Sequence, residues 1–175
     1  MIIDILLATY NGEKYLREQL DSLVGQTNQD WRIIARDDGS NDATVSILKE
    51  YQEKLGKDKL IILPPAERNP EDNIPAWKRI IHNFSALAEW SKNDGNAEYV
   101  MFSDQDDIWH ADKIERSLTE QHKLEEKYGK DSPLLVNTDA RMITADGLEK
   151  YRSYVKYLHF HPEKEKGLYH LTVNV

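Results

Sequence analysis

Three carboxylates occur close together in the chain, at Asp104, Asp106 and Asp107. They follow the apolar run 99–102, which begins after the turn-forming residues 93–96 and is therefore predicted to be a buried strand. Alternation along a strand places Asp104 and Asp106 on the same side, and hard oxygen ligands at this spacing suit Mg²⁺ or Mn²⁺ held jointly with substrate phosphates. A solvated acidic turn that caps the following helix is the alternative, and a single D-x-D pattern does not decide between the two.

Two other polar groups follow apolar runs earlier in the chain. Asp37 and Asp38 come after residues 31–35, where a carboxylate can cap the next helix or accept a hydrogen bond from a nucleobase N–H or a ribose hydroxyl. Residues 9–11 come after the first apolar run, and there Tyr10 either stacks on a base or packs in the core. Both readings stay open for each group.

The order of the elements that carry these groups predicts an α/β fold with a mainly parallel central sheet. Apolar runs predict strands at residues 2–8, 31–35, 60–63, 99–102 and 134–136. Helical spacing of apolar residues predicts amphipathic helices at about residues 16–24, 42–55, 76–91 and 112–128. The helix 76–91 is expected to bury Trp77, Ile80 and Ile81, and residues 145–147 predict the turn of a hairpin.

Parallel sheets bind ligands beyond the carboxyl ends of their strands, so we expect the three polar groups to converge on one edge. Neither phosphate-binding glycine pattern is present, since Asn11-Gly12 is not G-x-G-x-x-G and no G-x-x-x-x-G-K-[ST] occurs. If a nucleotide diphosphate binds, a divalent cation on Asp106 would neutralise it. Trp109 is expected to pack beneath this site.

Composition restricts the class of protein. The chain has 175 residues, enough for one domain with its own core, and contains no cysteine for disulfides or thiolate chemistry. A formal net charge of -8 argues against nucleic acid as a partner. No stretch reaches the apolar length of a membrane span, so we expect a cytoplasmic protein, with peripheral attachment of a longer enzyme to the inner face of the membrane left open.

Three motifs together resemble the family 2 inverting glycosyltransferases: ILLATYNG at residues 5–12, RDDGSNDAT at 36–44 and FSDQDDIW at 102–109. Their order and separations also fit, and the resemblance covers nearly the whole chain. The SDQDDIW form and the Asn83-Phe84 pair further resemble a bacterial rhamnosyltransferase-like branch. The resemblance implies the GT-A fold, a fold that binds nucleotide-diphospho-sugars with Mn²⁺ or Mg²⁺.

The resemblance also implies roles for single residues. The implied nucleotide-binding residues come from the three strand ends and are Thr9, Tyr10, Asn11, Asp38 and Asp104. Asp38 would hydrogen-bond the base, and Asp106 would ligate the metal with Asp104 beside it. The implied donor is a UDP-, dTDP- or GDP-sugar, and the implied acceptor is a saccharide or a lipid-linked molecule.

One feature of the family is missing from the pattern. An inverting displacement needs a general base to deprotonate the acceptor hydroxyl, and only Asp139 and Glu149 are weak candidates after the metal motif. We therefore expect residues 1–138 to form the donor-binding core. Residues 139–175 are expected to be the incomplete start of an acceptor-side region, with the catalytic base beyond Val175.

Two other functions compete with this reading. A nucleotidyltransferase of related architecture would favour a glycine-rich, basic loop after the first strand, which residues 9–13 lack. A non-catalytic module that binds divalent cations or carbohydrate is the other alternative, although the acidic run does not continue into the D-x-[DN]-x-[DN]-G-x5-E calcium pattern.

Overall fold

The computed structural model describes residues 2–65 and 74–159. The chain divides into two compact units, Met1–Leu118 and Thr119–Val175, and each is described by itself. None of the described helices is long and apolar enough to cross a membrane.

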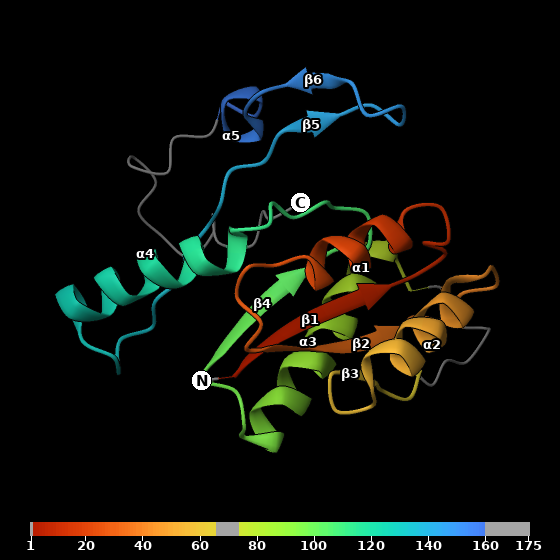
Figure 1. Cartoon of the computed structure of the whole chain (residues 1–175), viewed down its shortest axis with the longest axis horizontal. Helices are drawn as coiled ribbons and strands as arrows, with labels where there is room; N and C mark the ends of the chain where they lie inside the picture. The colour runs from red at the N-terminus through yellow and green to blue at the C-terminus, as the bar shows by residue number, and fades with distance from the viewer. Residues whose placement is uncertain (1, 66–73, 160–175) are drawn as a thin grey trace. The chain divides into compact units, whose positions relative to one another are not determined.

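The first unit is built on a parallel sheet in the order β3-β2-β1-β4 (Figure 1). Its strands are β1 (Ile3–Thr9), β2 (Trp31–Asp37), β3 (Leu60–Ile62) and β4 (Tyr99–Ser103). Strand β1 is central and pairs in parallel with both β2 and β4. Nearly every residue of β1 and β2 is buried, as expected for strands covered on both faces. The predicted α/β fold with a parallel central sheet is confirmed.

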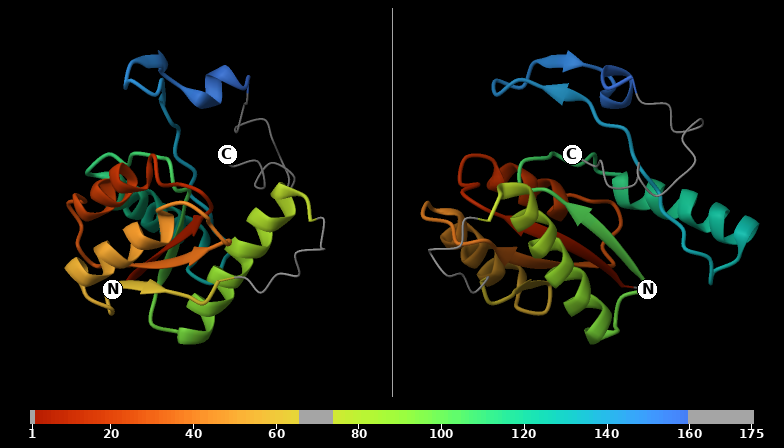
Figure 2. Two further views of the ribbon diagram at one scale, coloured as in Figure 1. Left: turned by 90° about the vertical axis from the view of Figure 1, so that its right-hand side faces the viewer. Right: turned by 180° about the vertical axis from the view of Figure 1, so that it is seen from behind.

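Helices cover both faces of this sheet (Figure 2). They are α1 (Leu16–Val24), α2 (Thr44–Leu55) and α3 (Ala76–Asp94), followed by α4 (Lys113–Tyr128), which begins in the first unit. On one face, side chains of α1 and α2 such as Leu20 and Leu48 pack against Ile5 and Ile33 of the sheet. On the other face, Leu87 of α3 joins a second, smaller core cluster.

Helix α3 departs from the prediction in the residues that it buries. Trp77, Ile80 and Ile81 are exposed, with 57% of the surface of Trp77 accessible. The sheet presents a small apolar surface to α3, and Leu87 lies at its centre with Phe84 packed beside it. The first turns of α3 therefore keep their apolar side chains on the surface of this unit.

The second unit contains the rest of α4, a hairpin of β5 (Met142–Ile143) and β6 (Glu149–Tyr151), and the short helix α5 (Tyr154–Tyr157). The predicted hairpin is confirmed, and Gly147 adopts a positive φ of 82° in its turn. The predicted strand at residues 134–136 is wrong, because this short apolar run pairs with no neighbouring strand among the described residues. The division of function at residue 138 stays a prediction.

Candidate active site

The carboxyl ends of β1, β2 and β4 lie at one edge of the sheet, where the candidate site is found. Thr9 pairs with Asp37 across β1 and β2, and Leu7 pairs with Ser103 across β1 and β4. The backbone amide of Asp38 continues the ladder by donating to the carbonyl of Thr9 at 2.8 Å. The polar groups that follow the three strands therefore converge, as the sequence predicts.

Asp37 organises the turn after β2. Its buried carboxylate accepts hydrogen bonds from the hydroxyl of Thr9 at 2.9 Å, from the hydroxyl of Ser40 at 2.6 Å and from the backbone amides of Gly39 and Ser40 at 2.9 and 2.7 Å. Of the two adjacent carboxylates, Asp37 is thus the one that holds the local structure. Its neighbour Asp38 interacts with a group outside this turn.

Hydrogen bonds in both directions join the loop after β1 to the loop after β2. The bonds run from Asn11 N to Ser40 Oγ, Gly12 N to Thr44 Oγ1, Glu13 N to Asp42 Oδ2, Asn41 N to Asn11 Oδ1 and Ala43 N to Glu13 Oε2. Asn11 adopts a positive φ of 48°, a conformation that asparagine tolerates better than most residues. The two loops therefore form one connected surface at the sheet edge.

Tyr10, Asp38 and Arg79 form a contact group at this edge. The Nε of Arg79 donates to Oδ2 of Asp38 at 3.1 Å, and the guanidinium carbon lies 4.3 Å from the centre of the Tyr10 ring. Tyr10 is 41% exposed, so its ring is a surface group and not part of the core. Sequence reasoning does not single out Arg79, because it lies on α3, far along the chain from both partners.

Gln105 connects the acidic strand end to β1. Its Oε1 accepts a hydrogen bond from the backbone amide of Tyr10 at 2.8 Å, and its Nε2 donates to the carbonyl of Tyr10 at 2.9 Å. The backbone of Gly12 lies against the same side chain, and a Cβ atom there would come within 2.3 Å of Oε1. Sequence alternation places Gln105 opposite to the carboxylates, but it does not identify this partner.

The carboxylates after β4 carry concentrated negative charge. Burial, followed by the charges of Asp107 and Asp106, raises the pKa of Asp104 to about 6. Burial and the charge of Asp106 also raise the pKa of Asp107, against the opposing effect of Lys113. Within residues 2–65 and 74–159, no three His, Cys, Asp or Glu side chains are grouped so that they could hold a metal ion by themselves.

The segment after the carboxylates is anchored to α1 and the turn that follows it. Trp109 is buried, as predicted, and its backbone amide donates to the hydroxyl of Ser22 at 3.0 Å. Gln26 donates to the carbonyl of His110 at 2.8 Å and accepts from the amide of Ile114 at 3.1 Å. On the other face of the sheet, Asn83 is buried and exchanges hydrogen bonds with Arg36. The carboxylates thus sit on a fixed scaffold.

The parallel sheet is flanked by helices and carries acidic residues after β2 and β4, an arrangement that agrees with the predicted GT-A fold. The model of the glycosyl transferase family 2 matches residues 4–128, and the chain belongs to this family. This assignment favours the glycosyltransferase reading over the nucleotidyltransferase and the non-catalytic module.

Three similar proteins illustrate the match. The dTDP-rhamnosyl transferase RfbG of Shigella flexneri is 35% identical over 112 residues, which cover 64% of this chain and 35% of that protein. The structure of S. aureus TarS 1–349 has a TM-score of 0.50 at 20% identity, covering 90% of this chain and 44% of TarS. The mannosyltransferase PcManGT of Pyrobaculum calidifontis, solved with GDP-Man and Mn²⁺, has a TM-score of 0.50 at 18% identity and covers 66% and 31% of the two chains. The chain spans about 35% of the length of RfbG, the first of these relatives.

Proposed function

We propose that this chain is the donor-binding part of a glycosyltransferase that takes a sugar from a nucleotide-diphospho-sugar. The observation that carries the proposal is the convergence of Tyr10, Asp38 and the carboxylates 104–107 on the carboxyl edge of one parallel sheet. Ligands of such sheets bind at that edge. Membership of the glycosyl transferase family 2 supports the same reaction class.

The nucleotide is proposed to bind over Tyr10 and Asp38. The exposed ring of Tyr10 offers a face for a base, and the carboxylate of Asp38 can accept a hydrogen bond from a base N–H. Arg79 contacts both groups and is included in this site. Thr9 and Asn11 are assigned a supporting part, because their side chains bond to Asp37 and to the amide of Asn41.

A divalent cation, Mn²⁺ or Mg²⁺, is proposed to bind Asp106, with Asp104 beside it. Burial, followed by the charges of Asp107 and Asp106, raises the pKa of Asp104, and carboxylate oxygens are suitable ligands for either ion. Because the protein offers few ligands, the diphosphate would supply others, as in many Mg²⁺ sites. When bound, the cation would stabilise the negative charge of the leaving diphosphate. The Mn²⁺ complex of PcManGT supports this choice of metal.

For the acceptor, only the chemical class is proposed. Transfer with inversion to a saccharide or lipid-linked acceptor requires a base for the acceptor hydroxyl. Neither weak candidate suits that role, because Asp139 accepts backbone amide bonds from Ala140 and Val155, and Glu149 pairs with Arg141 and Arg152. We assign no base among the described residues.

The similarity to RfbG favours dTDP-rhamnose as the donor and cell-surface polysaccharide as the product, with UDP- and GDP-sugars as the alternatives. The sugar transfer would take place in the cytoplasm, at the inner face of the membrane where lipid-linked acceptors are exposed.

The metal assignment is tested with Asp106→Ala. We expect this variant to lose Mn²⁺-dependent binding of nucleotide diphosphate in calorimetric titrations while its circular dichroism spectrum is unchanged, because Asp106 is exposed and contributes no core contact. The control is Asp112→Asn, an exposed carboxylate of the same segment, which should bind as the parent does. Undiminished metal-dependent binding by Asp106→Ala would refute the assignment.

A further inference from the structure

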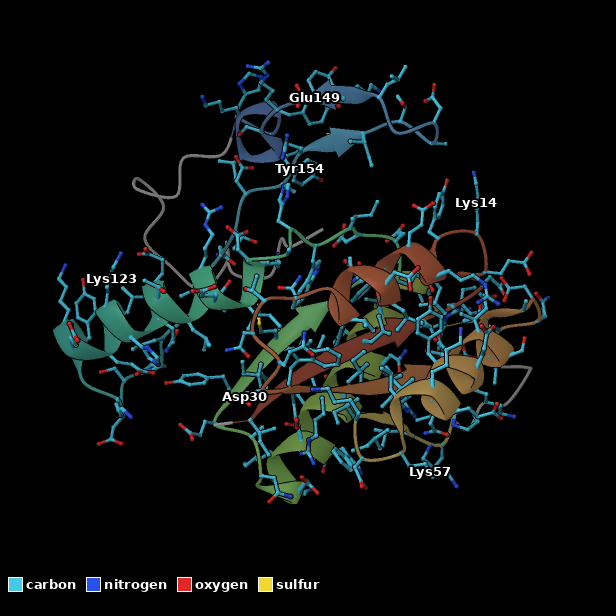
Figure 3. All side chains as sticks on the ribbon, viewed as in Figure 1. Lys14, Asp30, Lys57, Lys123, Glu149 and Tyr154 are labelled. Atoms are coloured by element: carbon cyan, nitrogen blue, oxygen red, sulfur yellow. The ribbon has the colours of Figure 1, made fainter. Side chains whose placement is uncertain are left out.

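The second unit has a cavity of about 700 Å³ that the donor site does not use. Its lining includes Asp139, Tyr151, Arg152, Lys156, Tyr157 and His159. Binding sites for small molecules commonly have volumes of roughly 300–1,000 Å³ and combine aromatic walls with a few polar groups. Figure 3 labels two residues of this region, Glu149 and Tyr154. The cavity is open to solvent, and its volume lies within this range.

Tyrosine rings form one wall of the cavity. The rings of Tyr151 and Tyr157 have centroids 4.5 Å apart, and Tyr154 stacks on Tyr157 at 6.3 Å. Tyr151 and Tyr157 remain 40% and 46% exposed although they support one another. An exposed tyrosine offers an apolar face together with a polar hydroxyl. This combination suits a sugar ring, which has an apolar C–H face and a rim of hydroxyl groups.

The charge of the cavity is locally positive in an acidic chain. The lining holds two cations, Arg152 and Lys156, and one carboxylate, Asp139, whereas the whole chain has a net charge of -8. Arg152 donates through Nε to Glu149 at 3.0 Å, and its side chain is 91% exposed. Arginine and lysine side chains in this arrangement are suited to binding a phosphate.

The carboxylate of Asp139 in the lining is held in place by the local backbone. Its Oδ1 accepts from the amides of Ala140 at 2.9 Å and Val155 at 3.1 Å. Burial would raise the pKa of Asp139, but the hydrogen bonds from Ser153 and from backbone amides outweigh burial and lower it. Asp139 therefore stays ionised as a structural anchor of the cavity wall.

We propose that this cavity binds a saccharide that carries a phosphate, with Tyr151 and Tyr157 against the sugar ring and Arg152 and Lys156 on the phosphate. The proposal rests on the function proposed above, for which it names the acceptor as a phosphate-linked saccharide. Such a phosphate is present both in lipid-linked saccharides and in free sugar phosphates, and the experiment distinguishes these two sources.

The test is a ligand-observed NMR titration of the full chain with glucose 1-phosphate, glucose and inorganic phosphate. We expect glucose 1-phosphate to bind more tightly than glucose or inorganic phosphate alone. We also expect its binding to weaken with added salt, because salt screens exposed charges. Tyr157→Ala and the double variant Arg152→Ala/Lys156→Ala should each weaken binding about tenfold, a change of about 1.4 kcal/mol. Lys130→Ala, which changes an exposed lysine outside the cavity lining, should bind as the parent does.

Three results would overturn the proposal: no binding of glucose 1-phosphate, equal binding of glucose or inorganic phosphate alone, or unchanged binding in both cavity variants. Nucleotide binding with Mn²⁺ is measured on the same variants and should be unaffected. A chain that binds glucose 1-phosphate but no nucleotide would contradict the donor site and leave the cavity assignment intact. Co-sedimentation with phosphatidylcholine vesicles that carry a polyprenyl-phosphate sugar would support the lipid-linked source, and retention of the free sugar phosphate alone would support the soluble one.

Discussion

Gln105 lies between two predicted metal ligands in the chain, yet its side chain hydrogen-bonds to the residue that follows β1. Both halves of its amide bond to the backbone of Tyr10, and Gly12 leaves the space that this amide occupies. Asp104 and Asp106, on either side of Gln105 in the chain, follow the end of β4 and lie outside any strand. These two hydrogen bonds join the segment that carries the carboxylates to Tyr10, the proposed partner of the base.

This arrangement predicts a non-additive pair of substitutions. Gln105→Ala removes two hydrogen bonds and should lower the free energy of unfolding by about 1–2 kcal/mol. Gly12→Ala should cost a similar amount, because its Cβ would displace the Gln105 amide. The double variant should be little less stable than Gln105→Ala alone, a coupling that urea denaturation of all four chains measures. Strictly additive losses would show that Gly12 acts independently of Gln105.

The residues of the site differ in how far the sequence predicts them. The carboxylates 104–107 and the buried Trp109 follow from an apolar run that ends in charge, since both features are local in the chain. Arg79 and the pairing of Gln105 with Tyr10 depend on contacts between distant segments, which no local pattern encodes.

At the scale of elements, a buried ion pair joins β1, β2 and α3 far from the candidate site. Asp4 of β1 is fully buried, and its carboxylate accepts from Nε of Arg32 on β2 at 2.6 Å and from the hydroxyl of Ser91 on α3 at 2.6 Å. Arg32 also bonds to Asp94 at the end of α3. This network fixes the helix to the sheet at the edge opposite to the site.

Removing one partner of the network should be costly. Asp4→Ala removes the buried carboxylate while Arg32 keeps Asp94 as a partner, and it should lower the free energy of unfolding by about 1.5–3 kcal/mol. Ser91→Ala removes one neutral donor and should cost only about 1 kcal/mol. Urea denaturation followed by tryptophan fluorescence measures the free energy of unfolding of both variants. Equal losses of stability would show that the ion pair stabilises the fold no more than the Ser91 hydrogen bond does.

Helices α1 and α2 are joined by an exposed ion pair that predicts a pH dependence. Hydrogen bonds from Arg17 and Lys54 lower the pKa of Glu50 from 4.5 to about 2. Because the folded pKa lies below the unfolded one, Glu50 stabilises the protein above pH 4.5 and loses this effect as the pH falls towards 2. The melting temperature of Glu50→Gln should therefore lie slightly below that of the parent at neutral pH and approach it in acid.

The comparison of Glu50→Gln with the parent is made by thermal melts at several pH values. Molar salt should also reduce the difference, because exposed charges are screened. A difference that is constant across pH would mean that the ion pair contributes no stability.

The elements themselves were largely predictable, and the exceptions share a cause. Alternation of apolar runs with helical spacing predicts β1 to β4 and the helices between them, because each pattern is a local property. Residues 134–136 have a strand-like composition, but a strand also requires a neighbour. The exposed Trp77 and Ile80 likewise depend on how much sheet lies opposite α3. Both exceptions depend on partners that the local pattern does not contain.

At the scale of the whole molecule, the residues matched by the family and the residues that line the cavity lie in different parts of the chain. The match to the glycosyl transferase family 2 covers residues 4–128, which includes every residue of the proposed donor site. The cavity in the second unit lies outside that match, in residues 139–159. Donor binding is therefore the part of the reaction that the family supports most directly, while acceptor binding rests on the chemistry of the cavity.

Donor binding is tested most directly by a thermal-shift panel of UDP, dTDP and GDP, each with Mn²⁺ and with a chelator. A ligand that binds the native state raises the melting temperature by mass action. We predict a shift that needs both one nucleotide and the metal, with dTDP giving the largest effect. The absence of a shift with every pair, or an equal shift in the presence of the chelator, would contradict a metal-dependent donor site at the edge formed by β1, β2 and β4.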